Sequence, residues 1–135
     1  PEVRAGVERV GRDPGAVAVV AAVPSAVTDD RDTAKERLRS DLVPYFSLPF
    51  YRAMLERSGF GADIAAFDRA MQENGPQAAA AAISDRFIAS LAAIGPKSEA
   101  RAAVERYQRA GATVPCVGPI PGTDFQATLD GLAPR

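Results

Sequence analysis

The sequence predicts an α/β fold that forms the end of a parallel barrel or sheet. Two apolar segments, 16–23 and 113–120, lack polar alternation and read as strands that helices cover on both faces. Residues 92–119 have the helix, glycine break and strand order of half a βα unit. So few strands cannot close the commonest α/β barrel, which needs about eight strands and about 250 residues. We therefore expect an incomplete architecture with paired parallel strands and helices on the outside.

The first third of the chain is expected to run helix, strand, helix. A helix is predicted over 2–11, and the first strand is expected to end at Pro24. Residues 28–42 have the four-residue spacing of an amphipathic helix, and its acidic start complements the positive end of the helix dipole. Consecutive acidic side chains on a helix point in different directions, so capping by Thr28 or Asp29 is favoured over a metal site.

The middle of the chain is predicted to be a helical insertion over about 44–94. More than half of the nine aromatic residues lie within 45–60. Further helices are predicted over 62–73 and over 76–95, where alanine is frequent and has high helix propensity. A third strand is compatible with 88–94. The insertion would interrupt the alternation of strands and helices.

The last part of the chain is expected to return to that alternation. A helix capped by Ser98 or a neighbour is predicted to end at Gly111, ahead of the second strand. A short final helix is predicted over 123–132. Cys116 lies in the apolar strand with no candidate base beside it, so we expect a buried structural thiol.

The composition excludes several classes of function. The net charge of −1 offers no basic face for nucleic acid or for an anionic membrane, and no apolar run approaches the roughly 20 residues of a membrane span. The sequence has no histidine, which excludes Ser-His-Asp and Cys-His nucleophiles and histidine-based metal sites. The single cysteine indicates a reducing, cytoplasmic location. Because the chain starts at Pro1, we expect a piece of a longer protein.

Three stretches resemble the later part of bacterial-luciferase-like monooxygenases. They are "VGRDPGAVAVVAAVPSAVTDDRDTAKERLR", "LPFYRAMLERSGFG" and "AIGPKSEARAAVERYQRAGATVPCVGPI", and the similarity covers roughly residues 3–132. One departure is "PKS" at 96–98, where members usually carry Thr-Pro-Glu. The resemblance implies that residues 1–135 are the C-terminal fragment of a single TIM (β/α)8-barrel domain with a helical insertion.

The resemblance also implies chemistry on a coenzyme. It indicates an oxidoreductase or monooxygenase that transfers hydride between coenzyme F420, or alternatively FMN, and a small organic substrate. Most cofactor contacts and the catalytic residues would lie outside this chain, and the complete protein would be a possible homodimer. The alternative from a different class is a non-catalytic helical binding module whose contact surface is the aromatic stretch 45–60.

Candidate site residues follow from the placement of function in barrels, at the carboxyl ends of strands. Ser25 follows the first strand and is a candidate for cofactor binding, while Gly118 and Pro119 close the second and are candidates for substrate binding. The competing interpretation is that these residues only turn the chain.

Two further pairs complete the candidates. Lys97 and Ser98 combine a cation, a hydroxyl and free helix amides, and would hold an anionic part of the cofactor. Phe50 and Tyr51 would cover an apolar substrate pocket, although the sequence favours the simpler interpretation that they pack the inserted helices together. No carboxylate or tyrosine is nominated as a catalytic residue, and no metal is expected.

Overall fold

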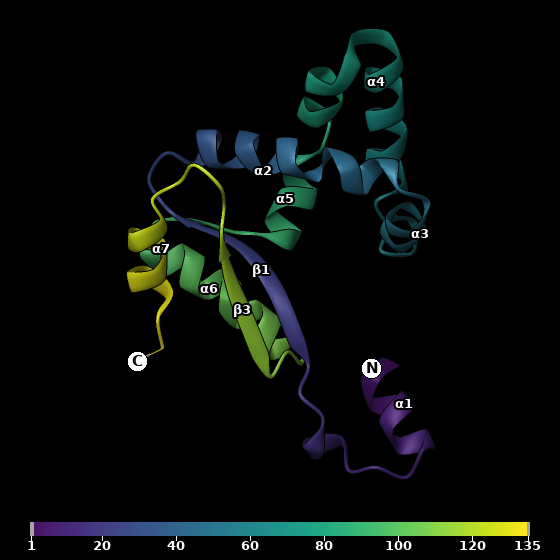
Figure 1. The fold of residues 1–135 in the computed structure, drawn as a ribbon, viewed down its shortest axis with the longest axis vertical. Coiled ribbons are helices and arrows are strands. Elements are labelled where there is room, and N and C mark those ends of the chain that lie inside the picture. The colour runs from purple at the N-terminus through teal and green to yellow at the C-terminus, as the bar shows by residue number, and fades with distance from the viewer. Residues whose placement is uncertain (1, 135) are drawn as a thin grey trace.

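The computed structural model describes residues 2–134 as helices packed around a small parallel sheet. Figure 1 shows α2–α5 gathered at the carboxyl end of the strands, α6 and α7 beside the strands, and α1 beyond their other end. The elements follow in the order α1 (Glu2–Arg9), η1 (Pro14–Ala16), β1 (Val20–Val27), α2 (Arg31–Ser47), α3 (Pro49–Arg57), α4 (Gly61–Ala81), α5 (Asp85–Leu91), β2 (Ala93–Gly95), α6 (Lys97–Arg109), β3 (Val114–Pro119) and α7 (Phe125–Leu132).

The sheet confirms that the two predicted strands are neighbours. Its order is β2-β1-β3, and β1 pairs in parallel with both of the others, with Val20 opposite Val114 and Ser25 opposite Ala93. The expected barrel is not present in residues 2–134, where the sheet is open. The order also departs from a barrel, because successive βα units place strands side by side in chain order, whereas here the first strand is central.

The first strand begins four residues later than predicted. Residues 14–16 form a single helical turn instead, because the Asp13 carboxylate accepts a hydrogen bond from the Gly15 N–H at 3.0 Å and holds the chain in that turn. The strand then runs through Pro24, which was expected to end it. Strand β2 pairs only from Ser25 onward, so the N–H that Pro24 lacks falls before that pairing begins.

Helix α2 is longer than predicted and has a different cap. Asp30 accepts a hydrogen bond from the Thr33 N–H at 3.2 Å, whereas Thr28 and Asp29 lie outside the helix. Hydrogen bonds from the Thr33 side chain and from the Thr33 N–H lower the pKa of the Asp30 carboxyl. Helix α2 continues through Pro44 because its apolar stripe continues to Phe46, which is fully buried.

The predicted helix over 76–95 is divided into three pieces. Gly75 has a φ of 79°, so the chain turns sharply inside α4 before Pro76. Ser84 then caps α5 by accepting a hydrogen bond from the Phe87 N–H at 3.1 Å. A third strand was expected within 88–94, and the structure has a short strand, β2, at Ala93–Gly95. Helix α6 begins at Lys97, and no side chain caps it, contrary to the cap predicted at Ser98.

Two separate clusters form the core. The larger one joins α2, α4 and α5 through aromatic and large aliphatic side chains, and the smaller one joins β1 and β2 to α6 mainly through alanine. Cys116 is exposed, so the prediction of a buried thiol is wrong. The reason is that β3 pairs on one side only and its residues alternate between exposed and half-buried positions.

Candidate functional site

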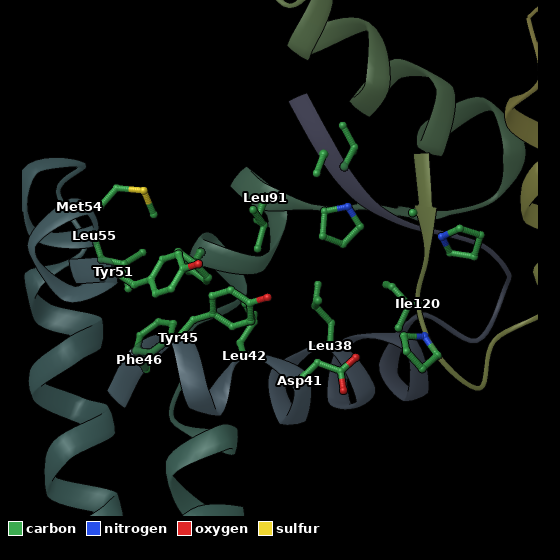
Figure 2. Close-up of a pocket in the computed structure, with 17 residues that line it drawn as sticks. Leu38, Asp41, Leu42, Tyr45, Phe46, Tyr51, Met54, Leu55, Leu91 and Ile120 are labelled. Atoms are coloured by element: carbon green, nitrogen blue, oxygen red, sulfur yellow. The ribbon is translucent and has the colours of Figure 1, made fainter. Parts of the chain in front are cut away.

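A cavity of about 430 Å³ lies between the helical layer and the sheet. Its walls come from the middle of β1, the C-terminal half of α2, α3, the C-terminal half of α5 and the segment that ends β3 (Figure 2). The carboxyl ends of parallel strands are where ligands bind in open α/β sheets and in α/β barrels. The position of this cavity therefore makes it the candidate functional site.

The sheet side of the cavity is made of small or rigid residues. Ala22, Pro24 and Gly118 line it, and Pro24 is paired with Gly118 in the register of β1 and β3. Residues that alternate with these point to the opposite face, where Val23 packs against Ala100 in the smaller core. The volume exists because no large side chain projects from the cavity face of these strands.

The helical side of the cavity is aromatic. The rings of Tyr45 and Tyr51 meet edge to face, with centroids 4.8 Å apart and an interplanar angle of 67°. Figure 2 shows both phenol groups directed into the space that Leu38 and Ile120 border from the other side. Phe46 lies beneath them and is fully buried. Such walls suit a flat organic molecule.

Three polar side chains line this otherwise apolar space, namely Asp41, Tyr45 and Tyr51. Among residues 2–134, Tyr107 is the tyrosine whose hydroxyl donates a hydrogen bond, to the Leu91 carbonyl at 2.7 Å. Asp41 takes part in none of the ion pairs between described residues. The polar groups of the cavity are therefore available to a ligand.

The structure brings part of the predicted substrate set together. Tyr51, Gly118 and Pro119 all line the cavity, although Tyr51 is more than 60 residues from the other two in the chain. Phe50 does not line it: its side chain is 74% exposed and contacts Tyr51 edge to face, with centroids 5.4 Å apart.

The predicted cofactor set lies elsewhere. Ser25 is fully buried, and its hydroxyl donates a hydrogen bond to the Val23 carbonyl at 2.8 Å. Because it follows Pro24 along the strand, it points away from the cavity. Lys97 and Ser98 are exposed at the start of α6 and do not line the cavity either.

The start of α6 already holds a carboxylate. The Glu99 side chain lies about where a Cβ at Gly95 would be, with Oε2 3.3 Å from that position. Arg31 approaches the same carboxylate, with Nη2 2.8 Å from Oε1. An anion placed beside Lys97 would therefore meet an existing negative charge whose cationic partner is already engaged.

Sequence reasoning missed Asp41 and Tyr45. These residues are four apart and therefore share one face of α2 with Leu38. That spacing was visible, but the helix was expected to end at residue 42, which placed Tyr45 in another segment. Recognising that Phe46 continues the buried stripe of α2 would have placed both residues on a helix that faces the sheet.

The side chains that line the cavity determine which parts of a coenzyme or substrate it can bind. Its aromatic and aliphatic walls fit a planar ring, either of a substrate or of a flavin or deazaflavin. No Lys or Arg is among the described residues that line it, so the chain offers no cation there for a phosphate-bearing tail. The residues present fit the ring alone.

Metal and membrane sites were also searched in residues 2–134. No group of three or more cysteine or carboxylate side chains in this range is arranged to hold a metal ion. Within the same range, none of the helices has both the length and the apolar character of a membrane span.

Comparison with known proteins identifies one family. The model of the luciferase-like monooxygenase family matches residues 1–114, which is most of the 135 residues. The matched range includes α1 through α6 and reaches the first residue of β3. Comparison with curated proteins gives no match.

Proposed function

The chain belongs to the luciferase-like monooxygenase family, and we propose that it forms one wall of the active site of an oxidoreductase. Membership of this family implies oxidoreductase chemistry in general. The proposed reaction is hydride transfer between coenzyme F420, or alternatively FMN, and a small organic substrate. When bound, that coenzyme gives or receives the hydride, and the residues of this chain position the substrate beside it.

The observation that carries this proposal is the cavity that lies against the middle of β1 and the carboxyl end of β3. It combines an apolar volume large enough for an organic ring with aromatic walls and few polar groups, as small-molecule sites do. Tyr51, Gly118 and Pro119 would contact the substrate, and Phe50 would affect the site only through Tyr51.

The coenzyme itself would be held mainly outside this chain. Lys97 and Ser98 stay candidates for its anionic part, at the start of α6, but the Glu99 carboxylate weighs against a phosphate there. Ser25 would act through the backbone of β1 because it points away from the cavity. No further step is assigned to these three residues.

The proposal extends to the whole protein. We propose that further strands of the complete protein pair with the outer edge of β3, which is unpaired in residues 2–134. The complete protein would be cytoplasmic, would act on a small molecule rather than on nucleic acid or membrane, and would form a homodimer.

The test compares two lengths of the protein. The protein expressed from its complete reading frame is expected to quench F420 or FMN fluorescence on binding, with a micromolar or lower Kd. The chain of residues 1–135 is expected not to bind either coenzyme at micromolar concentration. Absence of binding of both coenzymes to the complete protein would overturn the proposed function.

The second candidate function is a contact surface formed by the aromatic stretch 45–60. The observation in its favour is that Leu48 and Phe50 are both exposed, at 50% and 74%. A second copy of the chain is the proposed partner. If Phe50→Ser leaves the molar mass in light scattering unchanged from that of the unaltered protein, this surface is not the dimer contact.

A further inference from the structure

We propose that the cavity selects flat organic substrates that carry a protonated amine and disfavours those that carry a carboxylate. This inference rests on the proposed function, in which the cavity is the substrate site. It concerns the chemical class of the substrate, which neither the family match nor the resemblance provides.

The shape and lining of the cavity define the apolar part of the ligand. A volume of about 430 Å³ accommodates a two-ring aromatic group with space to spare. Tyr45 and Tyr51 offer ring edges and faces on one side, and Leu38 and Ile120 offer aliphatic contacts on the other (Figure 2). A planar ring can therefore contact both walls at once.

The charge of the lining defines the polar part. Asp41 is the one charged residue among the described residues that line the cavity, and it forms no ion pair with another described residue. It lies on α2 beside Leu38 and close to the segment that follows β3 (Figure 2). A cationic nitrogen at that end of the cavity would gain a charge-assisted hydrogen bond.

Arg37, a cation on the same helix, is directed toward Gly122. The Arg37 guanidinium lies against Gly122, 2.0 Å from the position that a Cβ there would take, and Arg37 does not line the cavity. The hydroxyls of Tyr45 and Tyr51 can both donate and accept a hydrogen bond, so they can serve an amine or a carboxylate. Asp41 is therefore the group of the cavity that favours an amine over a carboxylate.

Three probes with one ring system test the proposal. They are 2-naphthylmethylamine, 2-naphthylmethanol and 2-naphthoate, which are positive, neutral and negative at pH 7. Calorimetric titration into the protein expressed from its complete reading frame measures binding without any turnover. Because Asp41 is at an exposed edge of the cavity, we expect the amine to bind about fivefold tighter than the alcohol at low salt.

Two variants of α2 separate a local from a general charge effect. Asp41→Asn is expected to remove the preference for the amine while leaving the affinity for the alcohol unchanged. Glu36→Gln removes the same charge from an exposed position of the same helix that does not line the cavity, and is expected to keep the preference. Both substitutions are close in shape to the original side chain.

Three results would overturn the proposal. They are a carboxylate probe that binds as tightly as the amine, an amine preference that persists in Asp41→Asn, and a failure of all three probes to bind. Coenzyme binding is measured separately, so the substrate class can fail while the proposed function stands. If the complete protein binds neither coenzyme but keeps the preference for the amine, the proposed function fails while the substrate class stands.

Discussion

The helical layer and the sheet of this protein are stabilised very differently. In the helical layer Phe46 packs against Phe67 and Phe87, with ring centroids 5.2 Å and 5.3 Å away. In the smaller sheet core the fully or nearly fully buried residues are Val23 and three alanines, while Val20 on the same central strand is 62% exposed. Large buried side chains contribute most of the stabilising apolar area.

Polar contacts follow the same division. Arg52 donates two hydrogen bonds to Asp68 within the helical layer, one of them at 2.8 Å, and Arg39 and Lys35 both approach Asp85. The sheet, in contrast, has one long edge and exposed strand residues in the described range. The helical layer thus completes its own core, whereas the sheet presents a face and an edge to further structure, and the candidate site lies where the two meet.

The largest expected effect is in the helical layer. Phe46→Ala should lower the free energy of unfolding by about 3–5 kcal/mol, because it removes a fully buried ring and leaves a cavity between two others. Urea unfolding followed by circular dichroism measures this change. Phe50→Ala is the matched control on an exposed ring and should change stability by less than about 0.5 kcal/mol. Equal effects of the two would contradict the comparison.

A smaller effect is expected where α7 meets the sheet. A Cβ at Gly131 would lie 2.7 Å from Cγ2 of Val27, so Gly131→Ala should push α7 away from β1 at a cost of about 1–3 kcal/mol. At Gly6, in α1, a Cβ meets no atom within 4 Å, so Gly6→Ala should be neutral or stabilising by up to about 1 kcal/mol. A Gly131→Ala protein as stable as Gly6→Ala would show that α7 does not pack closely on the sheet.

The smallest expected effect concerns pH and again separates the two regions. The hydrogen bonds from Arg52 lower the pKa of the Asp68 carboxyl, and those from Arg39 and Lys35 lower the pKa of Asp85. A folded-state pKa below the unfolded value of about 3.9 means that the unfolded chain binds more protons at acid pH. The stabilisation is thus present above about pH 4 and is lost as the pH falls through the folded-state pKa values.

The size of this acid effect is limited by exposure. The Asp68 side chain is 42% exposed, so solvent screening holds its share to about 1 kcal/mol or less. Asp68→Asn should make unfolding less dependent on pH between about 2 and 4. Hydrogen exchange should show acid loosening of α3 and α4 before that of α6, whose internal ion pair between Glu105 and Arg109 is exposed on the surface. Loss of hydrogen-exchange protection in α6 before α3 and α4 would contradict the proposed difference between the two regions.

The sequence predicted the strand pairing but not the strand boundaries. The continuous apolar runs of 16–23 and 113–120 predicted two strands, although β3 is exposed or half-buried along its length. The start of β1 depends on the Asp13 side chain closing a turn over 14–16, a local hydrogen bond that apolar patterning does not register. Likewise the division of 76–95 depends on the left-handed Gly75 and the Ser84 cap.

The candidate site was predictable in part for similar reasons. Placement of function at strand ends led to Gly118 and Pro119, which line the same cavity as Tyr51. The face to which a strand residue points depends on register, so Ser25 could not be assigned to a side before Val23 and Pro24 were placed. Tyr45 was not placed on the same helix face as Asp41 because that helix was expected to end at residue 42.

The central claim, that the cavity between the helical layer and the sheet is the substrate site, is tested most directly by filling it from the sheet side. A Cβ at Gly118 meets no atom closer than 3.9 Å, so Gly118→Leu can project into the cavity without backbone strain. Gly61→Leu is the control, since a Cβ there meets nothing within 4 Å and Gly61 does not line the cavity. Calorimetry of 2-naphthylmethylamine binding should show a loss of at least about tenfold in affinity for Gly118→Leu and no change for Gly61→Leu. Unchanged binding by a folded Gly118→Leu protein would contradict the claim.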